Sequence, residues 1–207
     1  MKYPNALAGI KKILISQYME IISSVCLVFG GIIALAGAKG ESTPLVIIGG
    51  SVALVAAVVG VVALIFNLIG LNAARKDEKN FSTAFVFAVL TIIAAVLSAV
   101  LTSINPDIAD WLTFVSRIFE LAVLELSVAG VISLADKLHR DDIAQMGQTL
   151  RTMISIIWVI VLVVRIFGNR MDRISNVLDI ISSVLELVVY IIFIILLTRT
   201  KKMLEEN

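Results

Sequence analysis

Cysteine and histidine are scarce in this sequence: Cys26 and His139 are the only ones among 207 residues. A single cysteine excludes a disulfide within the chain and a metal site built from several cysteines. Cys26 and His139 also lie far apart in the sequence, which argues against a zinc site or a Cys–His nucleophile pair. We therefore expect no metal and no cofactor.

Motifs that mark common enzyme classes are absent as well. The sequence contains no GxxxxGK[ST] phosphate loop, no GxGxxG motif and no HExxH motif, which are patterns for phosphate, dinucleotide and zinc binding. A Ser–His–Asp set is not plausible, because the one histidine lies in a polar connection. An enzyme is therefore not expected. An intramembrane acid–base pair made of Glu125 and Glu186 has nothing specific in its favour.

Charge is also sparse, and hydrophobic residues dominate the chain. The formal net charge is +1, which gives no reason to expect nucleic acid as a partner. Hydrophobic residues make up 59% of the chain, against about 45–50% in soluble domains. A soluble core of this size could not cover so many long apolar runs, so the lipid bilayer must contact much of the surface.

Six apolar segments are predicted to cross the bilayer, so the expected fold is an all-α membrane protein with one transmembrane domain, residues 1–207. The predicted spans cover about 16–38, 45–71, 81–104, 111–135, 152–167 and 174–198. A basic helical lead-in is expected over residues 1–18. The longest connection is predicted at 136–151, with room for a short surface helix.

Small residues recur at four-residue spacing in the first two predicted spans. The two sets are Gly30, Ala34 and Ala38 in the first span and Gly49, Ala53 and Ala57 in the second. Residues four apart lie on one face of a helix, and small side chains there let two membrane helices approach closely. We therefore expect the first two spans to pack as a tight hairpin.

The distribution of basic residues predicts an orientation. With six spans, twelve of the 17 lysines and arginines fall on the side that carries both termini. Four fall on the other side, and Arg117 lies within a span. An excess of Lys and Arg marks cytoplasmic connections. We therefore expect a bacterial inner-membrane protein with both termini in the cytoplasm.

An internal repeat is a further hypothesis for the last four spans. A shift of 61 residues superimposes VLEL at 123–126 on VLEL at 184–187. Spans three and four would then be one hairpin, and spans five and six a second copy of it. Glu125 and Glu186 would be equivalent positions. Chance matches are common in apolar sequence, so the repeat stays open.

Six charged residues interrupt the last three predicted spans. They are Arg117, Glu120 and Glu125 in the fourth span, Arg165 in the fifth, and Asp179 and Glu186 in the sixth. Charges at such depths are costly and are normally paired or hydrated. Arg117 and Glu120 are three apart on one helix face, and Arg165 is expected at a depth similar to that of Asp179. The two arginines can therefore neutralise Glu120 and Asp179.

This assignment leaves Glu125 and Glu186 near mid-span without a basic residue at their depth. A carboxylate in that environment tends to take up a proton. One hypothesis is therefore a small transporter or channel, in which the four carboxylates bind a proton, a cation or a small cationic substrate. The alternative is a non-catalytic membrane scaffold or subunit, whose buried charges specify helix packing within the chain, in a homo-oligomer or with a partner membrane protein.

Overall fold

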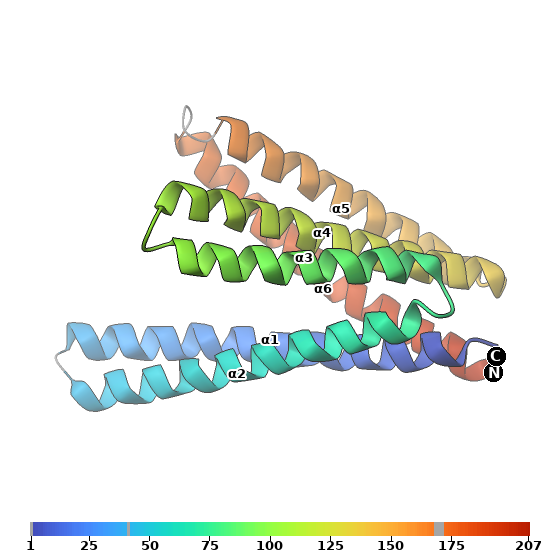
Figure 1. Cartoon of the computed structure of the whole chain (residues 1–207), viewed down its shortest axis with the longest axis horizontal. Coiled ribbons are helices and arrows are strands. Elements are labelled where there is room, and N and C mark those ends of the chain that lie inside the picture. Colours follow the sequence, from blue (N-terminus) through green and yellow to red (C-terminus); the bar gives the residue numbers. More distant parts are fainter. Residues whose placement is uncertain (1, 41, 168–171) are drawn as a thin grey trace. The chain divides into compact units, whose positions relative to one another are not determined.

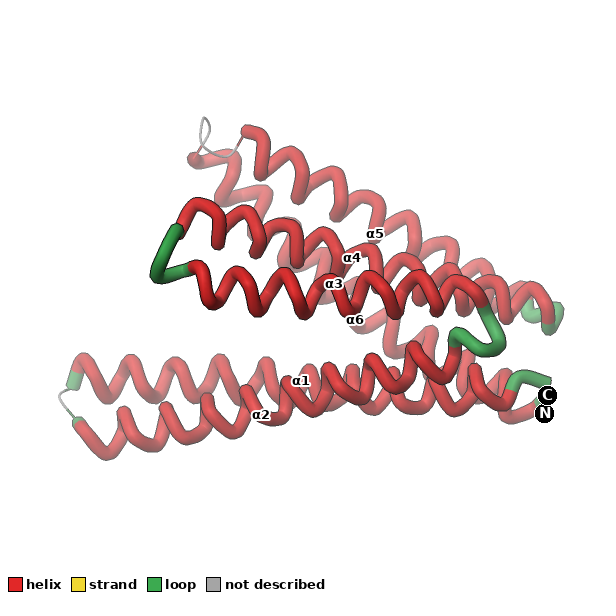
Figure 2. The backbone as a smooth tube through the Cα atoms, in the orientation of Figure 1, coloured by secondary structure: helices red, strands yellow, loops and turns green. Residues whose placement is uncertain are grey.

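The computed structural model describes the backbone of residues 2–40, 42–167 and 172–207. Side chains are described for the same residues except 164–167, 172–180, 182 and 183. Over these ranges the chain is helical throughout, with short connections (Figures 1 and 2). The helices are α1 (Pro4–Lys39), α2 (Thr43–Ala74), α3 (Lys79–Leu101), α4 (Pro106–Lys137), α5 (Asp141–Phe167) and α6 (Asp172–Glu206).

Among the described residues, five helices are long and apolar enough to cross a membrane. They are α1, α2, α3, α4 and the Asp141–Val163 part of α5. The all-helical prediction is confirmed, and the long apolar helices agree with the expected membrane class. The repeated hairpin, the single transmembrane domain and the choice of membrane stay predictions.

The chain divides into two compact units. Unit 2 comprises residues 11–70, which is most of α1 and α2. Unit 1 comprises residues 1–10 and 71–207, which adds the first turns of α1 and the end of α2 to helices α3–α6. Each unit has its own packing chemistry, so the two are described in turn.

Unit 2 is a helical hairpin whose contact is made by small residues. A methyl group added to Gly49 would lie 2.4 Å from the backbone nitrogen of Ala34, and one added to Gly30 would lie 2.9 Å from the carbonyl oxygen of Gly49. The hydroxyl of Ser23 donates a hydrogen bond of 2.7 Å to the carbonyl oxygen of Ala56 across the same contact. The predicted close approach of the first two spans is confirmed.

The neighbouring glycines of unit 2 behave differently. Gly31 and Gly50 each follow an interface glycine, and a methyl group added to either would meet nothing within 4 Å. Large apolar side chains on the outer faces of both helices are exposed, among them Phe29, Leu54 and Val55. This surface is apolar enough to contact lipid.

In unit 1, α3 and α4 form an antiparallel pair with a clear register. The Ser98 hydroxyl lies 2.8 Å from the Ala109 carbonyl oxygen, close to the connection between the helices. Further along, the Ser116 hydroxyl donates to the carbonyl oxygen of Thr91 at 3.4 Å. Near the other end, Phe81 packs against Gly130, where a methyl group would lie 2.7 Å from the ring.

The ends of these helices follow local chemistry that shifts the predicted bounds. Helix α3 ends at Leu101, three residues before the predicted end of its span, and α4 already begins at Pro106. The side chain of Asn105 accepts a hydrogen bond of 3.2 Å from the backbone N–H of Ile108. Proline fits the first turn of a helix, and asparagine is a favoured cap before it. Trp111 therefore lies inside α4 rather than at its start.

The connection expected at 136–151 is much shorter than predicted. Helix α5 begins at Asp141, so only Leu138–Arg140 link it to α4. Asp141 and Asp142 occupy the first turn of α5, where acidic side chains are favourable. Ile143, Leu150 and Ile154 are fully buried at near-helical spacing, which shows that an amphipathic helix runs through this polar-looking stretch.

His139 adopts a left-handed backbone conformation at this connection, with φ of 55°. The N–H of Arg140 donates to the carbonyl oxygen of Ala135, and that of His139 to the carbonyl oxygen of Asp136. These two bonds define a Schellman motif, in which the left-handed residue is usually glycine. The single histidine of the chain thus ends a helix.

Candidate functional site: charged residues of helices α4 to α6

An ion pair between Arg117 and Glu186 joins α4 to α6. The hydrogen bond from Ser116 to Thr91 places Arg117 opposite the middle of α3, the shortest complete helix in the described chain. The Arg117 and Glu186 side chains are 44% and 38% exposed. This pair is therefore a half-exposed charged contact far from the ends of α3.

A second ion pair joins α4 to α5. The Nε atom of Arg151 donates to a carboxylate oxygen of Glu125 at 3.1 Å. Glu125 precedes the short Leu138–Arg140 connection by 13 residues and Arg151 follows it by 11, so the two face each other across the hairpin. Glu125 also lies between Ser116, opposite Thr91, and Gly130, opposite Phe81. It therefore lies opposite the first half of α3.

These two pairs correct the predicted partners of the glutamates. The sequence left Glu125 and Glu186 without a basic partner, whereas Glu186 pairs with Arg117 and Glu125 pairs with Arg151. The reason is that spacing along one helix does not reveal which helices are neighbours. Arg151 was also placed in a connection, although it lies within α5.

The remaining predicted site residues are placed only in part. Glu120 is exposed on α4, one turn from Arg117, and it too has an interaction partner. Arg165 on α5 and Asp179 on α6 belong to the helices, but their side chains lie outside the described residues. The predicted pairing of these two residues therefore stays a prediction.

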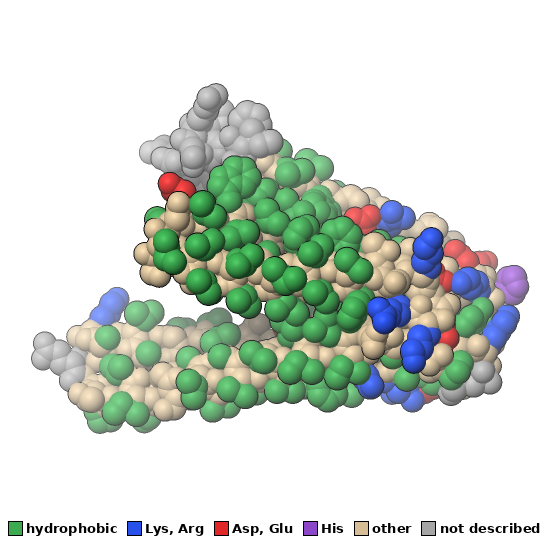
Figure 3. Space-filling view, viewed as in Figure 1, with side chains coloured by type: hydrophobic (Ala, Val, Ile, Leu, Met, Phe, Trp, Pro, Cys, Tyr) green, Lys and Arg blue, Asp and Glu red, His purple; other side chains and the backbone are tan. Residues whose placement is uncertain are grey.

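A different charged cluster gathers at the end of unit 1 that carries both chain termini (Figure 3). Its centre is Glu78, just before α3, whose side chain is only 6% exposed. One carboxylate oxygen of Glu78 accepts hydrogen bonds from Lys137 and, at 2.9 Å, from Ser133. The other accepts from Asn80 at 3.1 Å. Glu78 has no signal in the sequence that marks it as a buried centre, because it lies in a charged stretch between two apolar runs.

The surroundings of Glu78 act on its pKa in opposite directions. Burial alone raises the pKa of this carboxyl group, because it disfavours the charged form. Hydrogen bonds from Lys137 and Ser133 and the positive charge of Lys137 lower the pKa and outweigh burial. Glu78 is therefore held as a carboxylate that links the α2–α3 connection to α4.

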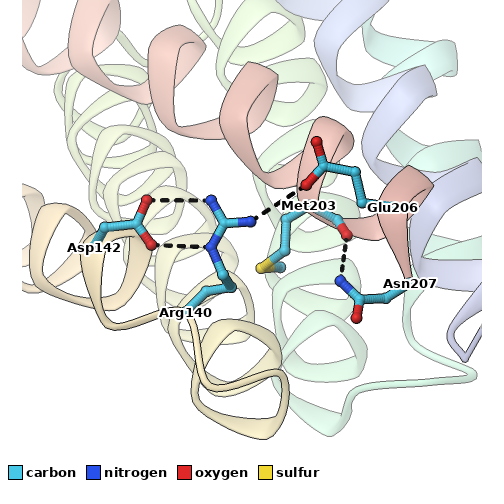
Figure 4. A network of polar contacts seen from close by, with 5 residues as sticks. All are labelled: Arg140, Asp142, Met203, Glu206 and Asn207. Atoms are coloured by element: carbon cyan, nitrogen blue, oxygen red, sulfur yellow. Dashed lines mark hydrogen bonds and ion pairs between the residues drawn. The ribbon is translucent and has the colours of Figure 1, made fainter.

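Two further contacts close the same end of unit 1. Asp77 accepts a hydrogen bond of 2.9 Å from the Asn5 side chain and one of 2.8 Å from the backbone N–H of Ala6, so it caps the start of α1. Arg140 holds both carboxylate oxygens of Asp142, at 3.1 and 3.3 Å, and reaches Glu206 at 3.5 Å (Figure 4). Each connection is thus tied to a helix end.

Unit 1 also has a buried apolar core. Its fully buried side chains include Leu71, Phe81, Leu134, Ile143, Leu150, Leu196, Leu197 and Met203. Within the described part of the chain, no group of three or more His, Cys, Asp and Glu residues could hold a metal ion. The arrangement here is that of a structural clamp.

Comparisons with family models, curated proteins and solved structures give no match for this chain. The class that the residues define is therefore the coarse one: an all-helical protein with apolar helices of membrane-spanning length. Among the described residues, two ion pairs join α4 to α5 and to α6.

Proposed function

We propose that this protein is a non-catalytic membrane subunit or scaffold, whose charged residues specify how its helices pack. The observation that carries the proposal is the pairing of Glu186 with Arg117 and of Glu125 with Arg151. The transport hypothesis needs these two glutamates to bind the transported proton or cation. Each instead joins α4 to a different neighbouring helix.

The energetics of membrane burial explain why such pairs specify packing. A single charge at the centre of a membrane helix costs about 2.5–3.5 kcal/mol on insertion scales. Contact with an opposite charge on one particular neighbour offsets part of that cost, and any other arrangement forfeits it. Helices α4, α5 and α6 therefore have one favoured arrangement.

The half-exposure of the Arg117–Glu186 pair also supports a role in assembly with another membrane helix. Charged atoms that face lipid at the level of mid-α3 are unfavourable, so the exposed side of the pair suits contact with a polar group on another membrane helix. That helix belongs to a second copy of this chain or to a partner membrane protein. The proposed role is thus assembly.

The proposed location is a bacterial inner membrane, with both termini in the cytoplasm. Support comes from the Lys and Arg side chains that gather at the end of unit 1 that carries the termini (Figure 3). Single cysteines at His139 and Ser103 in a Cys26→Ser background test it. We expect only the Ser103 position to react with a membrane-impermeant maleimide in spheroplasts, and the reverse labelling would contradict this topology.

A small transporter or channel is the second candidate, and the same half-exposure favours it. A water-filled path would hydrate both Arg117 and Glu186 without any partner helix. Such a path would carry a proton, a cation or a cationic substrate. The rest of it would be lined by Glu125 and Arg151 and by the other predicted site residues, Glu120, Asp179 and Arg165.

Flux through proteoliposomes distinguishes the two candidates. Purified full-length protein is reconstituted with an internal pH-sensitive dye, and pH, Na⁺ and K⁺ gradients are imposed on wild type and Glu186→Gln. The subunit proposal predicts no flux above empty vesicles in either, and a lower Tm in detergent for Glu186→Gln. Wild-type flux that disappears in a Glu186→Gln protein of unchanged Tm would overturn it.

A further inference from the structure

The connection between α2 and α3 has the sequence Arg75-Lys76-Asp77-Glu78-Lys79, which mixes both charges. The structure separates them. Asp77 caps α1 and Glu78 is buried against Ser133 and Lys137, while Arg75, Lys76 and Lys79 are exposed. Among the described residues, neither Lys76 nor Lys79 has an ion-pair partner. The outer side of this connection is therefore cationic.

Arg75 is held at a defined position beside α3. Its guanidinium group lies over the ring of Phe85, 4.8 Å from the ring centre, which is a favourable cation–π geometry. Phe85 is in the second turn of α3 and is partly exposed. The positive charge of Arg75 is thus placed next to the point where the apolar part of α3 begins.

An apolar stripe continues from the same connection along α3. Val86, Leu90, Ile93 and Leu97 are all exposed. They follow Lys79 at intervals of seven, four, three and four residues, so all five side chains share one face of the helix. At about 1.5 Å per residue, the stripe from Lys79 to Leu97 is roughly 27 Å long, which is comparable to one hydrocarbon core thickness of about 30 Å.

We propose that this surface binds one anionic phospholipid, with its headgroup phosphate on Arg75, Lys76 and Lys79 and its acyl chains along the α3 stripe. Three positive charges without a neighbouring exposed acid on the connection favour a headgroup with net negative charge. A zwitterionic headgroup brings its own cation, which these residues would repel. The apolar stripe selects a lipid over a free anion, since an anion gains nothing from exposed valine and leucine.

Lipid retention by the full-length protein tests this proposal. Purified protein is titrated in mixed micelles of phosphatidylglycerol and phosphatidylcholine, and bound lipid is counted by native mass spectrometry. The variant R75Q/K76Q/K79Q removes the site. The matched control R199Q/K201Q/K202Q removes the same charge from α6, and circular dichroism and gel filtration check that both are folded.

We expect one tightly held phosphatidylglycerol on wild type and on the control, and an affinity at least roughly tenfold lower for R75Q/K76Q/K79Q. Glycerol 3-phosphate in excess should not displace the lipid. Equal losses in both triple variants would reduce the effect to general charge attraction and overturn the proposal. So would equal retention of phosphatidylcholine, or displacement by glycerol 3-phosphate. Should the triple variant not fold, the single variant Lys79→Gln gives the same comparison.

Discussion

The two units of this protein hold their helices together by different means. In unit 2, α1 and α2 approach until the backbone at Gly49 touches that at Ala34, and small residues make the contact. In unit 1, buried side chains such as Phe81 and Leu134 fill the space between helices, and ion pairs and hydrogen bonds join them. The difference teaches that one chain can fix the positions of its helices by shape in unit 2 and by charge in unit 1.

The largest expected effect comes from filling the contact of unit 2. Gly49→Leu adds a side chain where even a methyl group would lie 2.4 Å from backbone atoms of α1. Backbone cannot yield as a flexible side chain does, so we expect a loss of about 3 kcal/mol or more, seen as a lower Tm in detergent. Gly50→Leu is the matched control and should leave Tm nearly unchanged, because its position is open. Equal effects would refute a shape-determined contact.

The next largest effect comes from removing charge from unit 1. Lys137→Met strands the buried carboxylate of Glu78, which keeps only hydrogen bonds from Ser133 and Asn80. We expect a destabilisation of about 2 kcal/mol, measured by thermal unfolding. Lys202→Met changes the same charge at an exposed position of α6 and should have little effect. A Lys137→Met protein as stable as this control would mean that the clamp is unimportant.

Acid should weaken unit 1 through the same carboxylate. The pKa of Glu78 is lowered from its ordinary value of 4.5 in the folded protein, so its contribution is complete above that value. The contribution is lost as pH falls from about 4.5 through the lower folded pKa. Between pH 6 and pH 3.5, wild-type Tm should therefore fall more steeply than that of Glu78→Gln. Parallel curves would remove Glu78 from the account.

The smallest effect concerns the connection between α4 and α5. His139 has a left-handed backbone conformation, which costs glycine nothing and other residues more. His139→Gly should therefore raise the stability of unit 1 by about 0.5–1 kcal/mol, whereas His139→Ala should not. A stabilising alanine would show that the backbone conformation is not the cause.

Most of the helices could be predicted from the sequence, because apolar runs and small-residue spacing are local signals. The start of α5 at Asp141 was not predicted, because polar residues there hid a helical pattern. Asp141, Asp142 and Gln145 suggested a connection, while the buried positions Ile143 and Leu150 already carried a helical period. Recognition of that period would have shortened the connection to α4. It would also have placed Arg151 opposite Glu125.

The partner of Glu186 could not be predicted in the same way. Arg117 and Glu186 are 69 residues apart, and only the arrangement of α4 and α6 brings them together. The Glu78 clamp has a similar cause, since it joins residues 55 and 59 positions apart. Helix length follows from composition, whereas the choice of neighbours depends on packing between segments that are distant in the sequence.

The most direct test of charge-specified packing is a reversal of the Arg117–Glu186 pair. Tm of the purified full-length protein is measured in detergent for Arg117→Glu, Glu186→Arg and the double variant. We predict that each single change lowers Tm by several degrees, given about 2–4 °C per kcal/mol for a chain of this size, and that the double reversal restores most of the loss. A double variant whose loss equals the sum of the two single losses would contradict the account.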